Sequence, residues 1–228
     1  MKTLAIDCTS TCAAVALCEG DKLLSSYFAD NGSKHSESLL PAVEFVLAQN
    51  AATVDDLGMI ACAVGPGAFT GVRIGVCVAK GLAFGRDLPC VPVSTLAALA
   101  YNGVRLEGII SPVMDARRGQ LYNALFRADG GKMTRLSPDR LITPEALAAE
   151  LAEYFAPVYF CGDGSHIAVE LGLPNAAFMP PLLMSNSAYS VARVALEEYT
   201  AAPNADYSDA TLAPVYLRAS QAEREIKK

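Results

Sequence analysis

Three short runs of closely spaced hydrophobic residues open the chain, at Thr3 to Cys8, Ala13 to Cys18 and Lys22 to Phe28. Turn-forming residues separate them, first Thr9-Ser10-Thr11 and then Glu19-Gly20-Asp21. Short strand-like runs bounded by such turns are typical of an antiparallel meander. We therefore expect the chain to begin with antiparallel strands of one sheet.

A helix is predicted next, and it reaches about Gln49. Serine is a common N-cap, and both Ser33 and Ser36 stand where this helix could begin. If Ser36 caps the helix, Pro41 lies just past the first turn, whereas a helix capped by Ser33 is kinked at Pro41. The sequence leaves both starts open.

The apolar run Leu57 to Val64 predicts a buried strand, which Gly65-Pro66-Gly67 ends. A second helix, capped by Thr70, is expected to end near Gly85. The pattern then predicts a strand at Cys90 to Val93 and a helix from the N-cap Ser94 to about Asn102.

A similar plan starts again in the second half of the chain. Gly108 to Met114 and Gln120 to Phe126 predict paired strands around a turn at Arg117-Arg118-Gly119. Thr143-Pro144-Glu145 has the capping chemistry of a helix start, and that helix is expected to reach Phe155. The other predicted elements are a strand at Val158 to Cys161, a helix at Ser187 to Tyr199 and a strand at Ala213 to Leu217.

Because strands, hairpin and helices occur twice, the sequence predicts two related α/β lobes. We place the first lobe at residues 1–105 and the second at residues 106–228, with the boundary near residues 103 to 108. The last segment is a candidate for packing back onto the first lobe.

The composition fits a folded protein, since 52% of the 228 residues are hydrophobic and 18% are charged. The seven cysteines form no Cys-x-x-Cys pair and most lie in apolar runs, which favours buried, reduced thiols over disulfides or zinc ligands. Asp7 interrupts the opening apolar run before a signal peptide can form, and Leu57 to Val72 is too short and too broken for a membrane span. We expect a cytoplasmic protein that does not enter a membrane.

The formal net charge of −6 argues against a protein that binds tRNA alone. Basic residues are scattered, and the densest groups are Arg117-Arg118 and Arg224 to Lys228. If RNA is involved, we expect another subunit to supply most of the phosphate contacts.

Two features suit an anionic ligand, and each has a structural alternative. Gly65-Pro66-Gly67 joins a strand to a helix N-terminus, where free backbone N–H groups favour an anion such as phosphate. The structural alternative is that the glycines only allow close packing. Asp7 ends the first strand, where it could act on nucleotide phosphates through a metal or form a turn. His35-Ser36-Glu37 and Ser165-His166 are better explained by helix capping than by catalysis, and with only these two histidines a zinc site has little support.

Small residues form a stripe on the second helix, at Gly71, Gly75, Ala79 and Ala83. Each glycine inside an exposed helix costs about 1 kcal/mol relative to alanine, so a compensating contact is expected. Either a partner helix or an element of the same lobe can supply that contact.

Five segments together resemble the TsaB (YeaZ) family. They are Leu4-Ala5-Ile6-Asp7-Cys8-Thr9, His35-Ser36-Glu37-Ser38-Leu39-Leu40-Pro41, Gly65 to Gly75, Met114-Asp115-Ala116-Arg117-Arg118-Gly119 and Pro214-Val215-Tyr216-Leu217-Arg218. The resemblance spans residues 4 to 218 and implies an actin/Hsp70-like (ASKHA) fold with duplicated ribonuclease-H-like lobes.

The same resemblance implies an accessory role in bacterial threonylcarbamoyladenosine formation, in tRNAs that read codons beginning with A. It implies direct pairing with the catalytic paralogue TsaD through the helices at about residues 33–49 and 70–85, with the TsaE ATPase and TsaC as further partners and tRNA reached through the complex. A homodimer through the same helices is the alternative when the chain is alone. The implied interface residues are His35, Leu39, Val43, Gly71, Ile74, Gly75, Val78, Ala79 and Leu82.

The resemblance also implies that catalytic and metal-binding residues are missing. TsaD-like proteins carry His-x-x-x-His where this chain has Thr95 and Leu99, and a third ligand where it has Asn186. No cofactor is expected, and ATP or ADP would contact the chain only in the complex, through Asp7, Gly65, Gly67 and Asp115. The competing hypothesis is an independent enzyme, either a nucleotide-binding, phosphotransferase-like ATPase or a metallopeptidase.

Overall fold

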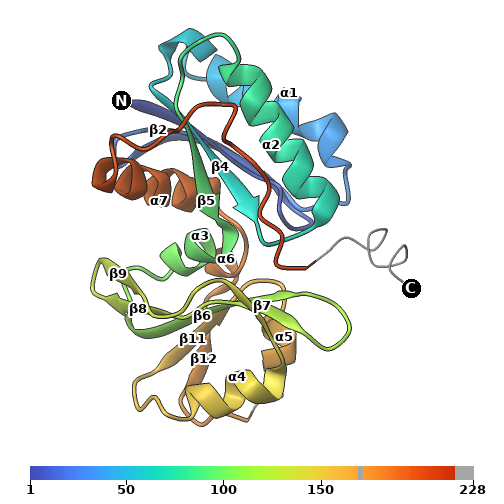
Figure 1. The fold of residues 1–228 in the computed structure, drawn as a ribbon, viewed down its shortest axis with the longest axis vertical. Coiled ribbons are helices and arrows are strands. Elements are labelled where there is room, and N and C mark those ends of the chain that lie inside the picture. The colour runs from blue at the N-terminus through green and yellow to red at the C-terminus, as the bar shows by residue number, and fades with distance from the viewer. Residues whose placement is uncertain (169–171, 219–228) are drawn as a thin grey trace.

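The computed structural model describes residues 1–168 and 172–218 and shows two α/β lobes stacked along the long axis of the molecule (Figure 1). The first lobe contains a five-stranded sheet in the order β3-β2-β1-β4-β5. Its strands are β1 (Lys2–Asp7), β2 (Ala13–Glu19), β3 (Lys22–Ala29), β4 (Met59–Gly65) and β5 (Cys90–Ser94). The predicted antiparallel meander is confirmed, because β1 and β3 both pair antiparallel with β2.

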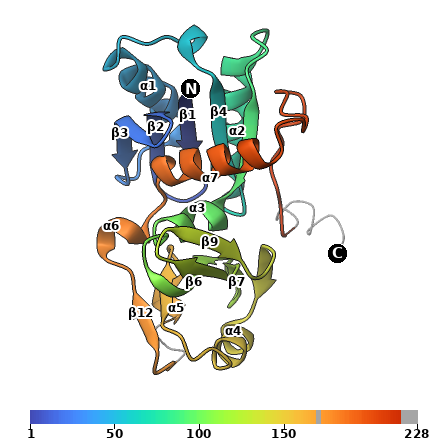
Figure 2. The ribbon, with the colours of Figure 1, turned by 90° about the vertical axis from the view of Figure 1, so that its left-hand side faces the viewer.

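Successive residues of these strands point to opposite faces, and both faces are covered. Leu4 and Ile6 of β1 face helices α1 (His35–Ala48) and α2 (Phe69–Ala83), whereas Ala5 faces α7 (Ala188–Ala201). Figure 2 shows α7 crossing the sheet on the side away from α1 and α2. The alanines on the α7 side let that helix approach closely, so a helix from the end of the chain completes the first lobe. A short 3-10 helix, Val54–Asp56, precedes β4.

The predicted starts of α1 and α2 are wrong, although both helices exist. The N-cap of α1 is Lys34 and that of α2 is Ala68, and neither helix has a side-chain cap. Neither Ser33 nor Ser36 caps α1, whose seventh residue is Pro41, and Thr70 lies inside α2. Ser94 does cap α3 (Thr95–Tyr101) by accepting a hydrogen bond from the Ala97 backbone N–H at 3.1 Å.

The second lobe is built on a mixed sheet with strand order β10-β7-β6-β11-β12, and β8 pairs with β6 and β9. Helices α4 and α5 cover one face of this sheet, while α3 and the inter-lobe core lie against the other. Helix α4 has the predicted Thr143 cap but ends before Phe155. The elements are β6 (Glu107–Asp115), β7 (Leu121–Asn123), β8 (Phe126–Asp129), β9 (Lys132–Arg135), β10 (Arg140–Ile142), α4 (Pro144–Leu151), β11 (Val158–Cys161), α5 (Ser165–Ala168), β12 (Ala176–Phe178) and α6 (Pro181–Met184).

After α7 the chain runs back along the first lobe as an extended segment, residues 203–218, which we call the strap. Its Leu212 is buried, and the Val215 backbone N–H donates to the Val64 carbonyl at 2.8 Å. The predicted strand at Ala213 to Leu217 is wrong. The segment crosses the end of β4 and makes this single backbone hydrogen bond to it, without the ladder of hydrogen bonds that defines a strand. The strap therefore links the first sheet to the mouth of the cleft between the lobes. No helix in the described ranges is long and apolar enough to cross a membrane.

Candidate functional site

Helices α1 and α2 lie side by side and present large apolar side chains on their outer surface. Phe84 is 76% exposed, Phe45 is 50% exposed and Leu40 is 46% exposed. We call this surface the α1–α2 face, and it also includes the partly buried Ile74, Val78 and Leu82. Large apolar side chains that are exposed on two neighbouring helices are candidates for a protein-binding surface.

Five residues predicted for a partner interface do not lie on this face. Leu39 and Val43 are 1% exposed and belong to the core beneath α1. The small-residue stripe of α2 points inward: a Cβ at Gly71 would collide with the Cys8 carbonyl oxygen, and one at Gly75 would lie 3.0 Å from the Cys8 Sγ. Ala79 is also fully buried. The compensating contact for the stripe is therefore strand β1 of the same lobe, and the prediction that Gly71, Gly75 and Ala79 face a partner is wrong.

The other predicted interface residues are partly exposed. The His35 ring lies between α1 and the turn after β1, where Nε2 donates to the Ser10 carbonyl oxygen at 2.9 Å. Sequence reasoning missed Leu40, Phe45 and Phe84. The signal for Leu40 and Phe45 was present, since both are offset from the Leu39, Val43 and Val46 positions that face the core.

Asp7 is buried at the end of β1, where it accepts hydrogen bonds both from the turn that follows it and from a distant part of the chain. One carboxylate oxygen accepts from the Thr9 backbone N–H at 2.9 Å and from the Thr9 hydroxyl at 2.7 Å. The other accepts from the side-chain amide of Asn186 at 2.8 Å, in the loop between α6 and α7. Burial raises the pKa of Asp7, and the hydrogen bonds from Asn186 and Thr9 oppose this increase. The carboxylate thus joins β1 to the loop that leads into α7.

Ionisation of Asp7 should lower the stability of the fold as the pH rises. Its folded-state pKa lies above the unfolded value of about 3.8, so the favourable contribution is complete below that value and is lost as pH rises through the folded pKa. Asp7→Asn removes this titration. The unfolding free energy of the variant relative to the wild type should therefore increase with pH above about 4 in urea titrations. A pH-independent difference between the two proteins would contradict this assignment.

The Gly65-Pro66-Gly67 turn is packed by backbone carbonyls. A Cβ at Gly65, whose φ is +116°, would lie 2.5 Å from the Val215 carbonyl oxygen, and one at Gly67 would collide with that of Thr9. The Thr9 carbonyl also accepts from the Ala68 backbone N–H at 2.6 Å. The glycines thus permit close approach of the strap and the turn after β1, which is the packing alternative left open by the sequence.

A cleft of about 380 Å³ lies between the lobes. It brings Gly67 together with Asp115 and the Thr9-Ser10-Thr11 turn, while Asp7 and Gly65 are not among its described lining residues. The Asp115 carboxylate is engaged by its own loop, since it accepts from the Arg117 backbone N–H at 2.7 Å and pairs with the Arg117 guanidinium at 3.3 Å. Of the predicted nucleotide contacts, only Gly67 and Asp115 therefore reach this cleft.

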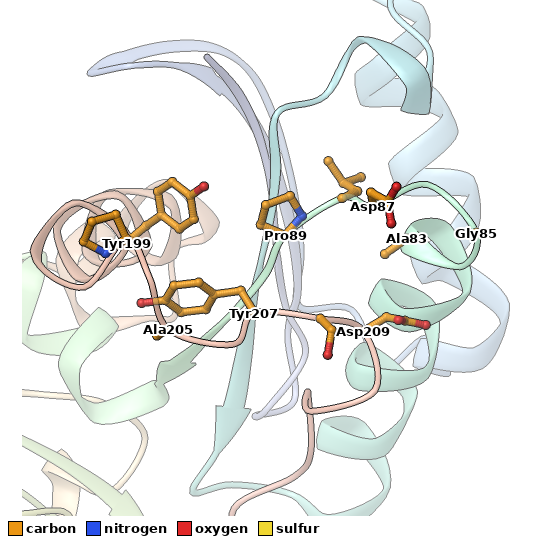
Figure 3. A pocket seen from close by; sticks show the side chains of 11 residues that line it. Ala83, Gly85, Asp87, Pro89, Tyr199, Ala205, Tyr207 and Asp209 are labelled. Carbon is orange, nitrogen blue, oxygen red and sulfur yellow. The ribbon is translucent and has the colours of Figure 1, made fainter.

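A second cavity, of about 330 Å³, lies between the α2–β5 turn and the strap. Figure 3 shows Tyr199 and Tyr207 at one end of it and Asp87 at the other. None of the predicted interface or nucleotide-contact residues lines this cavity, although Ala83 of the small-residue stripe does. Six of the seven cysteines are buried and Cys77 on α2 is exposed, so the expected buried thiols are confirmed except at Cys77.

Comparison with known proteins identifies the family. The family profile described as "TsaD: tRNA N6-adenosine threonylcarbamoyltransferase" matches residues 29–225. The Bacillus subtilis protein named "tRNA threonylcarbamoyladenosine biosynthesis protein TsaB" is 39% identical over 162 residues, which are 71% of each chain. The solved structure of YeaZ from Pseudomonas aeruginosa superposes with a TM-score of 0.81 at 28% identity, covering 95% of this chain and 99% of that one.

A more distant structure, component A of the (R)-2-hydroxyglutaryl-CoA dehydratase of Acidaminococcus fermentans, matches with a TM-score of 0.53 at 13% identity over 88% of this chain and 99% of that one. That similarity concerns the fold alone, and it agrees with the expected actin/Hsp70-like architecture. Family profile, sequence identity and fold point the same way, and the chain belongs to the TsaB (YeaZ) family.

Proposed function

We propose that the chain is a non-catalytic subunit that supports threonylcarbamoyl transfer to adenosine in tRNAs reading codons that begin with A. It acts by pairing with the catalytic paralogue TsaD through the α1–α2 face. The relative from Bacillus subtilis is named for tRNA threonylcarbamoyladenosine biosynthesis, and the matching family profile is named for the transferase itself. Both names support a place for this chain in the same reaction.

The observation that carries the pairing is the exposed apolar surface of the α1–α2 face. Phe84, Phe45 and Leu40 leave between 46% and 76% of their area in contact with solvent. Covering such side chains removes apolar surface from water, which favours binding by about 25 cal/mol for each Å² buried. Phenylalanine is enriched in the buried cores of protein interfaces, which supports a helix–helix partner on this surface.

The side chains at the positions of the paralogue's metal ligands support a non-catalytic role. Thr95 and Leu99 are fully buried in the core shared by the lobes, and Asn186 is engaged with Asp7. Across residues 1–168 and 172–218, no three His, Cys, Asp or Glu side chains are grouped so that they could hold a metal ion. A partner that carries the metal is the simplest source of Lewis-acid chemistry for the transfer.

The wider assembly follows from the same proposal. TsaE is an ATPase partner of the complex, TsaC supplies the adenylate, and most of the tRNA contacts come from other subunits because this chain carries a net charge of −6. A two-fold symmetric dimer uses the same surface on both subunits, so a homodimer through the same helices competes with the heterodimer when TsaD is absent.

Omission from a reconstituted bacterial system tests the function directly. With TsaD, TsaE, TsaC, tRNA, threonine, bicarbonate and ATP present, modified tRNA should form only when this chain is added. Mass spectrometry of digested tRNA measures the product. Equal yields with and without the chain would refute the proposal, and a TsaB protein from another bacterium serves as the positive control.

The second candidate is a nucleotide-binding ATPase, favoured by the inter-lobe cleft of about 380 Å³ in this fold. Calorimetric titration of the chain alone with magnesium and ATP separates the two. Micromolar binding with turnover would favour the ATPase, whereas binding only in the presence of TsaD would favour the subunit. A peptidase with a cysteine nucleophile has less support, because burial raises the pKa of Cys8 and of Cys12 to about 12.

A further inference from the structure

The mouth of the inter-lobe cleft is basic, although the protein as a whole is acidic. Arg117 and Arg118 project from the loop between β6 and β7, and Arg218 of the strap lines the same cleft. Two carboxylates, Asp115 and Asp163, also line it, and Asp115 is already paired with Arg117. In a chain of net charge −6, three arginines from two distant segments around one opening form a local site for anions.

The backbone of the arginine loop holds an unusual conformation. Arg117 and Arg118 have φ values of 65° and 58°, and Gly119 follows with 70°. Glycine or asparagine adopts this left-handed region with less strain than arginine does. Arginine side chains therefore need another reason to occupy these positions, and strained residues of this kind cluster at binding sites. Both side chains are exposed, and no ion pair is formed by Arg118 with any described residue.

Aromatic side chains stand beside these arginines. Tyr216 of the strap stacks on Phe69 with ring centroids 4.9 Å apart and remains 41% exposed. The Arg73 guanidinium lies 3.8 Å from the Phe69 ring centroid and donates to the Tyr216 hydroxyl at 2.8 Å. Arg218, two residues further along the strap, donates to the Ala116 carbonyl at 2.8 Å and so ties this stack to the arginine loop.

We propose that this rim, formed by Arg117, Arg118, Phe69, Arg73 and Tyr216, binds single-stranded RNA of the tRNA substrate. The arginines contact phosphates and the Tyr216 ring stacks a base. This inference rests on the proposed function and adds a direct RNA contact to a subunit that would otherwise reach tRNA only through its partners. Exposed arginines beside an aromatic platform are the usual means of holding single strands without reading their sequence.

Free ATP fits the same rim less well. A free nucleotide usually has most of its surface enclosed by its site, whereas these arginines and Tyr216 are exposed at an opening. The backbone carbonyls of Thr9 and Val215 pack against the turn after β4 and would face a phosphate there. The Asp115 carboxylate that could hold magnesium is engaged by its own loop. A strand that passes across the opening needs neither enclosure nor a metal.

The test compares two double variants in complex with TsaD, using a fluorescent anticodon stem-loop RNA as the probe. The double variant Arg117→Ala with Arg118→Ala should weaken binding about tenfold or more in 0.1 M salt. It should also reduce the salt slope, which is the slope of log K against the logarithm of salt concentration, by about 1.4, since each lost phosphate contact contributes about 0.7. The matched control, Arg105→Ala with Arg127→Ala, removes the same charge from exposed positions outside the rim and should leave binding unchanged. Tyr216→Leu should weaken binding about fivefold or more without changing the salt slope.

Three results would overturn the RNA contact. They are equal weakening by both double variants, unchanged binding in the Arg117 and Arg118 variant, or displacement of the RNA by magnesium–ATP at micromolar concentration. Each of them leaves the accessory role intact as long as modification still requires the chain. Failure of the accessory role has a separate readout, which is full tRNA modification when the chain is omitted.

Discussion

Replacing Leu40 and Phe45 by arginine should abolish the complex with TsaD and, with it, tRNA modification. Both side chains lie on α1 and are 46% and 50% exposed, so the substitutions leave the core of the chain unchanged. Each change places a charge where an apolar contact is expected, and hot-spot losses of about 2 kcal/mol or more lower affinity at least thirtyfold. The double variant should therefore bind at least about 100-fold more weakly in calorimetry.

The chain offers a matched control for this variant. Leu182 is 93% exposed and Phe155 is fully exposed, and both lie outside the α1–α2 face. Leu182→Arg with Phe155→Arg makes the same chemical changes elsewhere and should leave binding and modification at wild-type levels. Equal loss in the two double variants, or no loss in either, would remove the α1–α2 face from the pairing.

Cys77 provides a second readout that needs no engineering. It is the exposed thiol on α2, whereas the other six cysteines are buried, so a maleimide should label it selectively. Adding TsaD should slow this labelling in the wild type and in the control variant, and should leave it unchanged in the Leu40 and Phe45 variant. Unprotected Cys77 in a complex shown to form by calorimetry would place the interface elsewhere.

Gly71→Ala should destabilise the fold strongly, whereas Gly81→Ala in the same helix should stabilise it. A methyl group at position 71 would collide with the Cys8 carbonyl oxygen of β1, which belongs to a central strand that cannot move freely. Overpacking of this kind costs about 3 kcal/mol, or about 6–12 °C in Tm for a chain of this size. Gly81 has no atom within 4 Å of its Cβ position, so alanine there gains up to about 1 kcal/mol from helix propensity.

Thermal and urea denaturation measure both effects on one helix with the same substitution. A Gly71→Ala protein as stable as the wild type, with unimpaired binding to TsaD, would contradict the inward orientation of the stripe. Loss of TsaD binding without loss of stability would restore the hypothesis that the stripe meets a partner.

Much of the fold could be predicted because its signals are local. The first three strands, the strand at Met59–Gly65 and the Ser94 cap follow from residues that are neighbours in the chain. The predicted ends of helices and strands were wrong where tertiary contacts, and not local signals, set the boundary. Helix α1 begins without a side-chain cap, and residues 213–217 are extended but lie outside any ladder, because the strap crosses the end of β4.

The candidate site was predicted less well, since α2 is apolar around most of its circumference. Gly71, Gly75 and Ala79 are buried, whereas Ile74, Val78 and Leu82 are only partly buried at the edge of the core. Periodicity alone could not say which side meets β1. A stripe of small residues suits a partner helix and a nearby strand equally, and only the position of the Cys8 carbonyl decides between them.

The sequence by itself determined the α/β character of the chain, the antiparallel opening and the family, because each of these is written in residue type and short-range spacing. The tertiary structure alone decided which helix surfaces stay exposed, and it joined Asp7 to Asn186 and Tyr216 to Phe69. Contacts between residues that lie more than a hundred positions apart depend on how sheets and helices pack, and a local pattern carries no record of that packing.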